Sequence, residues 1–565
     1  MLEREKPGAT IVPIIISSDK TQLTQFRNKS AYPVYLTIGN LPKDIRRKPS
    51  RRGQILLGYL PTTRLEHIKS PTSRHHARTN LFHSCMRKIL QPLETAGVDG
   101  LEMASGDGVV RRCHPIFATF VGDYPEQVLV TCCKYTHCPK CPKLPDEFGD
   151  DSDISPLRDL VMVLAALDTL EEGPTAYACN CADAGIKAVH KPFWQDLPYV
   201  NIFRSITSDI LHQLYQGMIK HLLNWLKQSC DPAEIDACCR RLPPNHNLWF
   251  FSNGITLLSC VSGKEHSDMC RILLGLIIGM RLPQGLSPNR LVRAVRSMLD
   301  FLYLAQLPSH TTETLGYLRN ALTAFHENKS IFVDLGVRKD FEIPKLHSLQ
   351  HYIPTIEEFG TTDNYNTEYS ERLHIDFAKD AYRATNHKNE YPQMTLWLER
   401  KEKVLRHQLF IEWRISRQRQ LQNSPPDPIL HTHIKITRWP SVYRVSFDDF
   451  AADYGAADFR QALTVFIANY NNPNLNRTQL QHAAFRIILS FQRLPAFHKL
   501  KFWNEDPQGQ SDASDTLDVA HVRPQKRGKN GSWIPAWFDT VLVNINATGL
   551  SGVAGGFFSL RHTVY

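Results

Sequence analysis

Three carboxylates in the sequence stand where a metal-dependent nuclease would need them. Asp19 follows the apolar run 10–18, and Asp123 follows a second apolar run at 114–122. Glu371 lies in a polar stretch that opens a helical pattern. Three carboxylates can hold two divalent cations, which activate the attacking oxygen and stabilise the leaving oxygen of a phosphodiester. Because Mg²⁺ and Mn²⁺ prefer oxygen ligands, the pattern predicts a Mg²⁺ or Mn²⁺ site here.

Asp209 and His212 form a second pair of chemical interest. Their spacing places both side chains on one face of a helix predicted over 209–225. An aspartate that caps the helix beside a half-buried histidine explains the same pair, because helix starts favour Asp. From spacing alone, the cap is the stronger interpretation.

Cys138 and Cys141 form a C-x2-C pair, which can supply two of the four ligands of a tetrahedral zinc site. The chain has thirteen cysteines and no apolar signal core at its N-terminus, so reduced thiols or metal ligands are favoured over disulfides. We predict structural Zn²⁺ bound by Cys133, Cys138, Cys141 and Cys181, with buried free thiols as the alternative. The fourth ligand stays open among Cys181, His190, Cys132 and His137.

The net charge of +10 fits a polyanionic partner such as nucleic acid, although it also serves solubility. The loop 43–52 concentrates basic residues, and a hairpin tip beside Asp19 would face the carboxylates. We therefore predict DNA phosphate contacts there. The predicted DNA-binding residues are Arg46, Arg47, Lys48, Arg51 and Arg52. A basic helix at 394–422 is more simply a solvated face over an apolar stripe.

Hydrophobic patterning indicates the elements that must position these groups. Strands are expected at 10–18, 33–38 and 54–60, a helix at 78–95 and a strand near 113–121. This is the opening order of an RNase H-like fold. A further strand is expected at 127–132, with residues 123–125 as the turn before it. Helices are expected over most of 209–330, at 367–384 and at 394–422.

Each carboxylate also has an ordinary structural explanation. An aspartate at a strand end commonly caps a turn, and a glutamate on a helix is commonly solvated. For any one of the three residues taken alone, that explanation is favoured. Their shared placement in the order of an RNase H-like fold weakens it without removing it.

At 565 residues the chain is too long for one hydrophobic core. No apolar run reaches the roughly 18 residues of a membrane span. The expected architecture is α/β and α+β, and Pro425-Pro426 marks a linker within it. The expected segments are the first part of an RNase H-like core (1–132), a zinc-binding insert (133–200), a helical insertion (201–340), the end of the core with Glu371 and basic helices (341–424), and a C-terminal α+β domain (425–565).

Several stretches together carry a family resemblance. They are residues 14–23, 33–40, 114–141, 192–194, 208–214, 345–352 and 366–374. In combination they resemble the transposases of Plavaka-type elements of fungi, relatives of the CACTA (En/Spm) DDE transposases. The similarity spans about residues 8–420 and continues more weakly beyond them. The combination is specific, whereas no single stretch is.

The resemblance implies a DDE nuclease in which Asp19, Asp123 and Glu371 are the catalytic metal ligands. The D-x2-H motif of the family falls on Asp209 and His212, which raises an active-site role for this pair above the cap interpretation. Whether Asp123 or Asp209 is the second metal ligand stays open. Asp123 is preferred because it ends a strand, whereas Asp209 starts a helix.

The favoured hypothesis is a DDE-type DNA transposase, or a domesticated or degenerate copy of one. It would cleave and transfer DNA strands in the nucleus with Mg²⁺ or Mn²⁺, without a membrane partner and with homo-oligomerisation on DNA ends left open. A non-catalytic, transposon-derived DNA-binding protein is the alternative. A zinc-stabilised interaction scaffold is a third interpretation.

Overall fold

The computed structural model describes most of the chain in two compact units, Met1–Glu412 and Trp413–Tyr565. The described residues are 2–24, 29–105, 108–150, 154–243, 245, 247–259, 261–421, 433–437, 439–504, 516–528, 531–538, 541–544 and 557–560. The predicted linker at Pro425-Pro426 lies outside them. The division into five functional segments stays a prediction.

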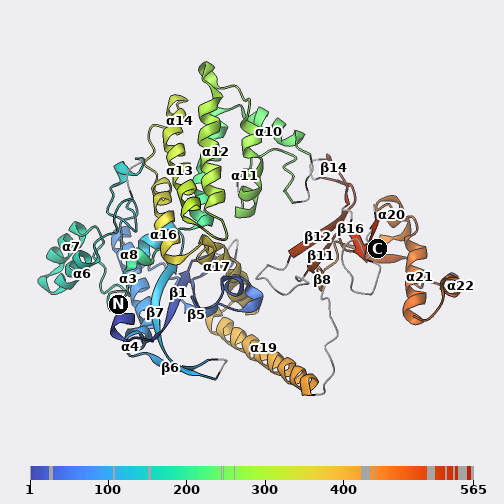
Figure 1. Ribbon diagram of the computed structural model, residues 1–565, viewed down its shortest axis with the longest axis horizontal. Helices are drawn as coiled ribbons and strands as arrows, with labels where there is room; N and C mark the ends of the chain where they lie inside the picture. Colours follow the sequence, from blue (N-terminus) through green and yellow to red (C-terminus); the bar gives the residue numbers. More distant parts are fainter. Residues whose placement is uncertain are drawn as a thin grey trace. The chain divides into compact units, whose positions relative to one another are not determined.

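The first unit is built on a five-stranded sheet with the order β5-β4-β1-β7-β6 (Figure 1). Its strands are β1 (Thr10–Ser18), β4 (Pro33–Ile38), β5 (Ile55–Tyr59), β6 (Leu101–Ala104) and β7 (Val110–Val121). β1 pairs with β4 in antiparallel fashion and with β7 in parallel. Ser17 is in register with Val121. The chain therefore leaves both central strands at the same edge, where Asp19 and Asp123 follow.

The strands predicted at 10–18 and 33–38 are confirmed at the same bounds, and β5 lies within the range predicted for the third strand. β1 is rich in Ile and Val, and three of its last four residues are buried, as expected for a central strand of a sheet. Near the N-terminus lie α1 (Leu2–Glu5), β2 (Thr21–Gln22), β3 (Ser30–Ala31), α2 (Lys43–Arg46) and η1 (Pro49–Arg51).

Two expectations for the next elements need correction. The helix predicted at 78–95 is two helices, α3 (Pro71–Leu90) and α4 (Pro92–Asp99). The strand predicted at 127–132 is wrong, because 124–130 form helix α5 (Tyr124–Val130). Asp123 caps this helix by accepting a hydrogen bond from the Glu126 main-chain N–H at 3.0 Å, and a proline in the first turn fits helical geometry.

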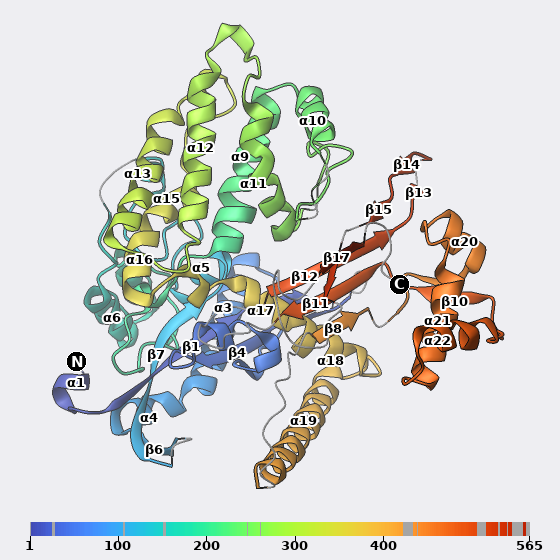
Figure 2. The ribbon, with the colours of Figure 1, turned by 45° about the vertical axis from the view of Figure 1, so that its right-hand side comes forward.

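The segment 201–340 is mainly helical, which confirms the prediction for 209–330, whereas its role as an insertion into the core stays a prediction. It contains the π-helix η4 (Ile210–Ile219), α9 (Lys220–Ser229), α10 (Pro232–Arg241), α11 (Gly263–Ile277), η5 (Pro283–Gly285), α12 (Pro288–Leu304), α13 (Thr312–Asn328) and α14 (Ile331–Asp334). Figure 2 shows α9, α11, α12 and α13 side by side, extending away from the sheet. Their buried faces share one hydrophobic cluster, with Trp225, Phe301 and Phe325 among its largest members.

Further elements flank this helical segment. Before it lie η2 (Pro145–Glu147), α6 (Leu160–Asp168), η3 (Thr169–Glu172), α7 (Pro174–Asp183) and α8 (Ile202–Ser205). After it come α15 (Pro344–His347), η6 (Ser348–His351), α16 (Tyr352–Phe359), η7 (Thr362–Asn364), α17 (Thr367–His374), the π-helix η8 (Ile375–Lys379), α18 (Asp380–Arg383) and α19 (Glu390–Leu421). The predicted helices at 367–384 and 394–422 correspond to α17–α18 and α19.

The second unit mixes strands and helices, as predicted. Its elements are β8 (His433–Ile436), β9 (Val442–Ser446), α20 (Phe447–Ala452), α21 (Phe459–Asn471), α22 (Arg477–Phe485), β10 (Arg493–Ala496), β11 (Lys499–Asn504), β12 (Thr516–Arg523), β13 (Lys526–Arg527), β14 (Trp533–Ile534), β15 (Trp537–Phe538), β16 (Val541–Asn544) and β17 (Phe557–Leu560). Its four-stranded sheet has the order β15-β12-β11-β8. Within the described part of the chain, no helix is long and apolar enough to span a membrane.

Candidate functional site

Asp19 and Asp123 form an acidic edge at the ends of the two central parallel strands. Burial raises the pKa of Asp19 to about 6, and the charges of Asp123 and Glu371 act in the same direction. Burial also raises the pKa of Asp123, although the N–H of Glu126 opposes this shift. The charges of Asp123 and Glu371 therefore both act on Asp19.

His212 connects this acidic edge to α17. Its Nδ1 lies 2.8 Å from Oδ2 of Asp209, and its Nε2 lies 3.1 Å from Oε1 of Glu371. Burial alone would lower the pKa of His212, but the hydrogen bonds to the two carboxylates outweigh it and raise the pKa to about 10. The imidazole is therefore a cation at neutral pH, held between two anions.

Asp209 is fully buried, and both of its carboxylate oxygens are occupied. Oδ2 accepts hydrogen bonds from the main-chain N–H and Nδ1 of His212, each at 2.8 Å. Oδ1 accepts from the hydroxyl and the N–H of Thr367, at 2.7 and 3.2 Å. Burial would raise the pKa of Asp209, yet these bonds lower it. Asp209 thus caps η4, as its spacing indicated, and also joins η4 to the start of α17.

Two buried residues beside the acidic edge were missed in the sequence. His374 follows Glu371 by one helical turn; its Nδ1 lies 3.0 Å from the Tyr35 hydroxyl and its Nε2 lies 4.0 Å from Oδ2 of Asp19. Burial lowers the pKa of His374 to about 4, so the ring is neutral. Glu126 accepts a hydrogen bond from the Tyr32 hydroxyl, and burial raises its pKa well above the usual range. The sequence signal that could have found them is spacing, because His374 follows Glu371 by three residues and Glu126 follows Asp123 by three residues.

A second cluster consists of Cys138, Cys141, His347 and His351, all buried. Their ligand atoms lie within 4.8 Å of one another. Sγ of Cys141 is 3.1 Å from Nε2 of His347, and Sγ of Cys138 is 3.3 Å from Nε2 of His351. Sulfur and nitrogen ligands of one tetrahedral zinc ion lie about 3.6 Å apart. The cluster could therefore hold Zn²⁺.

The structure gathers two of the four predicted zinc ligands and leaves the other two elsewhere. The Sγ atoms of Cys133 and Cys181 point to the carbonyls of Thr131 and Ala166 at 3.8 and 3.9 Å, within the core under the sheet. The other candidates for the fourth zinc ligand, Cys132, His137 and His190, do not belong to the cluster either. The twelve cysteines that the structure describes are all free. The missed signal was the H-x3-H pair at 347 and 351, far along the chain from the cysteines.

Residues 1–226 match the family model of the Plavaka transposases. The resemblance inferred from the motifs is confirmed over this part of the chain. The match includes Asp19, Asp123, Asp209 and His212, and ends before Glu371. The relationship to CACTA transposases stays a prediction. A search of curated proteins finds no match to the chain.

The three predicted catalytic carboxylates differ in layout from the Cys2His2 cluster. Among the described residues, the cluster is the one group of at least three potential ligands whose atoms all lie within 4.8 Å. Asp19, Asp123 and Glu371 are more widely spread. One ion could therefore not contact all three carboxylates as they stand.

Arg46 and Arg47 of the basic loop line a small cavity together with Ser17 and Val121, which lie at the strand ends before Asp19 and Asp123. The expectation that the loop faces the carboxylates stays a prediction. Arg46 is buried, and its guanidinium donates to both the main-chain and side-chain oxygens of Asn364 at 3.1 and 2.6 Å.

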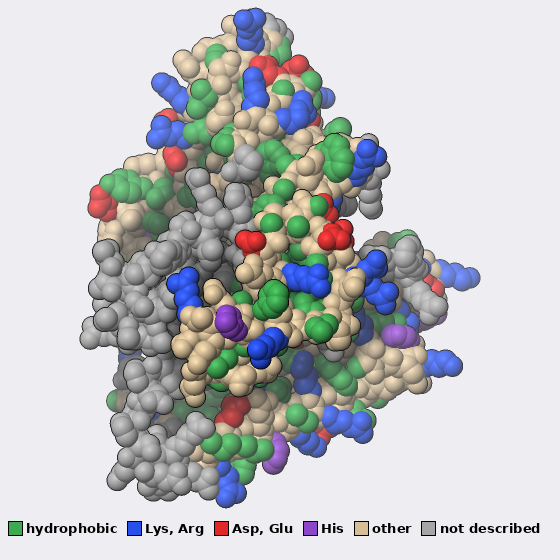
Figure 3. Space-filling model, turned by 90° about the vertical axis from the view of Figure 1, so that its right-hand side faces the viewer, with side chains coloured by type: hydrophobic (Ala, Val, Ile, Leu, Met, Phe, Trp, Pro, Cys, Tyr) green, Lys and Arg blue, Asp and Glu red, His purple; other side chains and the backbone are tan. Residues whose placement is uncertain are grey.

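The other predicted DNA contacts on this loop are more accessible. Arg47 forms an ion pair with Asp44 at 2.7 Å. Lys48 is half-buried, and Arg51 and Arg52 are exposed around η1. On the face drawn in Figure 3, Lys and Arg side chains of the described residues are dispersed among neutral and hydrophobic ones. The distribution of positive charge on that face therefore does not identify a DNA-binding surface.

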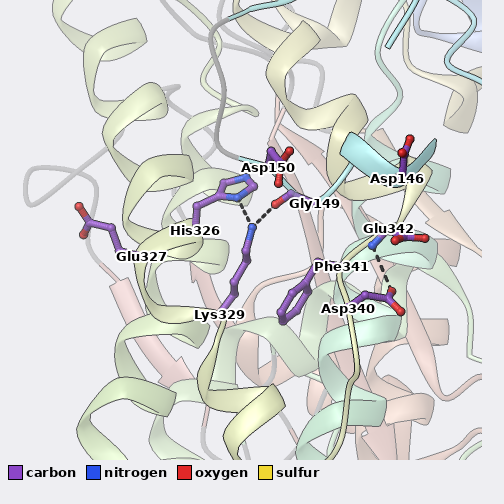
Figure 4. Close-up of a pocket in the computed structure, with 9 residues that line it drawn as sticks. All are labelled: Asp146, Gly149, Asp150, His326, Glu327, Lys329, Asp340, Phe341 and Glu342. Carbon is purple, nitrogen blue, oxygen red and sulfur yellow. Dashed lines mark hydrogen bonds between the residues drawn. The ribbon is translucent and has the colours of Figure 1, made fainter. Parts of the chain in front are cut away.

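A pocket of about 540 Å³ lies away from these residues (Figure 4). It is lined by Asp146, Gly149, Asp150, His326, Glu327, Lys329, Asp340, Phe341 and Glu342. Lys329 crosses it and donates to the Gly149 carbonyl while contacting His326. The carboxylates around it make the pocket unsuited to a polyanion, and none of the candidate catalytic residues lines it.

Proposed function

We propose that the protein is a DDE-type DNA transposase, or a copy descended from one, that cleaves DNA with Mg²⁺ or Mn²⁺. The freed 3′-hydroxyl would then attack target DNA. The observation that carries this proposal is that the charges of Asp123 and Glu371 both act on Asp19 beside two parallel strand ends. The Plavaka match over 1–226 supports the same class of function.

The donor set fits divalent cations. Burial raises the pKa values of Asp19 and Asp123, and the charge of Asp123 raises that of Asp19 further, so the ionised site is unfavourable without a counter-charge. When bound, a pair of divalent ions activates the attacking oxygen and stabilises the leaving oxygen. Asp123 is the better second ligand, because both oxygens of Asp209 already accept two hydrogen bonds each.

An RNase H-like core is part of the proposal. The strands β1, β4 and β5 are antiparallel neighbours and come first along the chain. Helix α3 and then strand β7, which pairs with β1 in parallel, come after them, in the order expected for this core. Ile206 adds a parallel bridge beside Phe120, three residues before Asp209. In this core Asp209 and His212 would position Glu371, whose orientation the His212 contact restricts.

DNA is the proposed partner, and nuclear residence follows from that substrate. Arg51 and Arg52 are the exposed candidates for phosphate contacts. Assembly of several copies on the DNA ends belongs to the same proposal and is testable by sizing the DNA complex.

The test is nicking of supercoiled plasmid DNA by the purified full chain with MnCl2. Asp19→Asn and Glu371→Gln should each lower the nicking rate by at least 100-fold, because each removes one anionic ligand. Glu171→Gln is the matched control, since Glu171 is exposed on η3. Equal rates for the wild type and Asp19→Asn would reject the proposed site.

A DNA-binding protein without catalysis is the second candidate. The contact that favours it is His212 with Glu371, because the imidazolium occupies an oxygen that a cation would need. This candidate predicts salt-dependent DNA binding without Mn²⁺ and no nicking with it. A nicking activity that Asp19→Asn abolishes would exclude it.

A further inference from the structure

The Cys2His2 cluster joins two stretches of chain that flank the helical segment 201–340. Cys138 and Cys141 lie on the loop after α5, whereas His347 and His351 lie on the continuous helical run from α15 to η6. The chain leaves the cluster after Cys141 and returns to it at His347. We propose that Zn²⁺ bound by these four residues forms a clasp, which links the two ends of the helical segment. The clasp thereby maintains the geometry of the carboxylate site.

Neighbouring residues make contacts to the cysteines and histidines of the cluster that would support a bound metal ion. The N–H of Lys140 donates to Sγ of Cys138 at 3.4 Å, and the Phe148 ring stacks on His347 at 4.5 Å. Nε2 of Gln350 lies 2.6 Å from Nδ1 and 3.1 Å from Nε2 of His347. This amide therefore restricts the orientation of the ring that would bind the metal. Two thiolates neutralise the charge of Zn²⁺, which suits a buried site.

The histidine side of the clasp reaches the carboxylate site through Tyr352. This residue directly follows His351, and its hydroxyl donates to the main-chain carbonyl of Asp209 at 2.8 Å. Asp209 in turn holds His212 and Thr367, and so sets where α17 begins. A shift of the helical run at His351 would be passed on to Asp209.

The cysteine side reaches it through two other residues. The ammonium of Lys140, between the two cysteines, donates to the carbonyl of Ile206, which lies on the stretch leading to Asp209. The Tyr124 hydroxyl donates to the carbonyls of Tyr135 and His137 at 2.6 and 2.9 Å. Tyr124 follows Asp123 directly, so the loop that holds the cysteines also fixes the start of α5.

The zinc site is tested by metal analysis of the purified full chain. We expect one Zn²⁺ per chain, lost in Cys138→Ser and in His351→Ala. The matched controls are Cys133→Ser and Cys181→Ser, which should retain it because these thiols lie outside the cluster. Absence of zinc from the wild type, or its loss in both controls as well, would overturn the site.

The clasp is tested by chelating zinc from the wild type and restoring it, so that no variant needs to fold. Mn²⁺ binding is followed by the electron paramagnetic resonance signal of the free ion. We expect chelation to weaken Mn²⁺ binding at least tenfold and zinc to restore it. Tyr352→Phe should keep zinc yet weaken Mn²⁺ binding. Unchanged Mn²⁺ binding after chelation would overturn the clasp.

The assigned role of the clasp rests on the proposed function, whereas the zinc site does not. A zinc-loaded wild type that binds no Mn²⁺ would refute the metal-nuclease proposal and the link to it. In that outcome the zinc site would still be supported if Cys138→Ser loses zinc while Cys133→Ser and Cys181→Ser retain it. The two failures are therefore distinguishable.

Discussion

His212 and Glu371 lie on different helices, and their side chains meet with Nε2 and Oε1 3.1 Å apart. The same imidazole contacts Asp209 with its other nitrogen. The first turn of η4 is thereby connected to α17, the helix that carries Glu371. Because the side chain of Glu371 is 42% exposed, the contact with His212 restricts its orientation.

The pH dependence of stability should report this contact. The pKa of His212 is raised from 6.5 to about 10 in the folded state, so its stabilisation is complete below pH 6.5 and is lost as the pH rises through about 10. Between pH 6.5 and 9.5, the stability of His212→Gln should fall less than that of the wild type, by about 3–4 kcal/mol. Urea unfolding at the two pH values measures this difference.

Glu371→Gln is the control for that experiment. It leaves the bond from His212 to Asp209 in place, so its loss of stability should lie between those of the wild type and His212→Gln. Parallel pH profiles for the wild type and His212→Gln would contradict the ion pair.

Asp19 should destabilise the protein when no cation is present. Its folded pKa of about 6 exceeds the ordinary 3.8, so its contribution favours folding below pH 3.8 and is lost as the pH rises through about 6. Asp19→Asn should therefore stabilise the metal-free protein at pH 8 by about 1–2 kcal/mol. MnCl2 should raise the melting temperature of the wild type and of Glu171→Gln, but not of Asp19→Asn. A destabilising Asp19→Asn would show that the carboxylate is satisfied without metal.

Thr367→Val should cost about 1–3 kcal/mol, because it removes a 2.7 Å hydrogen bond to the buried Asp209 carboxylate without opening a cavity. Denaturant unfolding measures the loss. Thr395→Val makes the same chemical change at an exposed position on α19 and should stay within about 0.5 kcal/mol of the wild type. Similar losses in both variants would mean that Asp209 does not depend on Thr367.

The arginines of the loop 43–52 should separate into two classes. Arg46→Ala should lower stability by about 1–3 kcal/mol, because Asn364 loses its buried partner. The double variant Arg51→Ala, Arg52→Ala should fold normally and weaken DNA binding, with the salt dependence reduced by about two phosphate contacts. Fluorescence anisotropy over a salt series measures both quantities. Unchanged DNA affinity in the double variant would place the DNA elsewhere.

Local patterns were sufficient for much of the fold. The strands β1 and β4 were predictable because β-branched residues in short apolar runs with polar ends favour strands. The strand expected at 127–132 failed because a short apolar run fits a strand or a helix face equally well. Asp123 followed by Pro125 was the better guide, since an aspartate cap and a proline in the first turn start helices.

The sequence by itself determined which side chains share one turn: Asp209 with His212, Cys138 with Cys141, and His347 with His351. Such spacings follow from the pitch of a helix or the reach of a tight turn. Only the tertiary structure decided which of these pairs meet. The cysteines meet the histidines, and His212 meets Glu371, because the chain returns to the sheet after a long helical segment. No local spacing encodes that return, since it depends on how the buried faces of the whole first unit pack together.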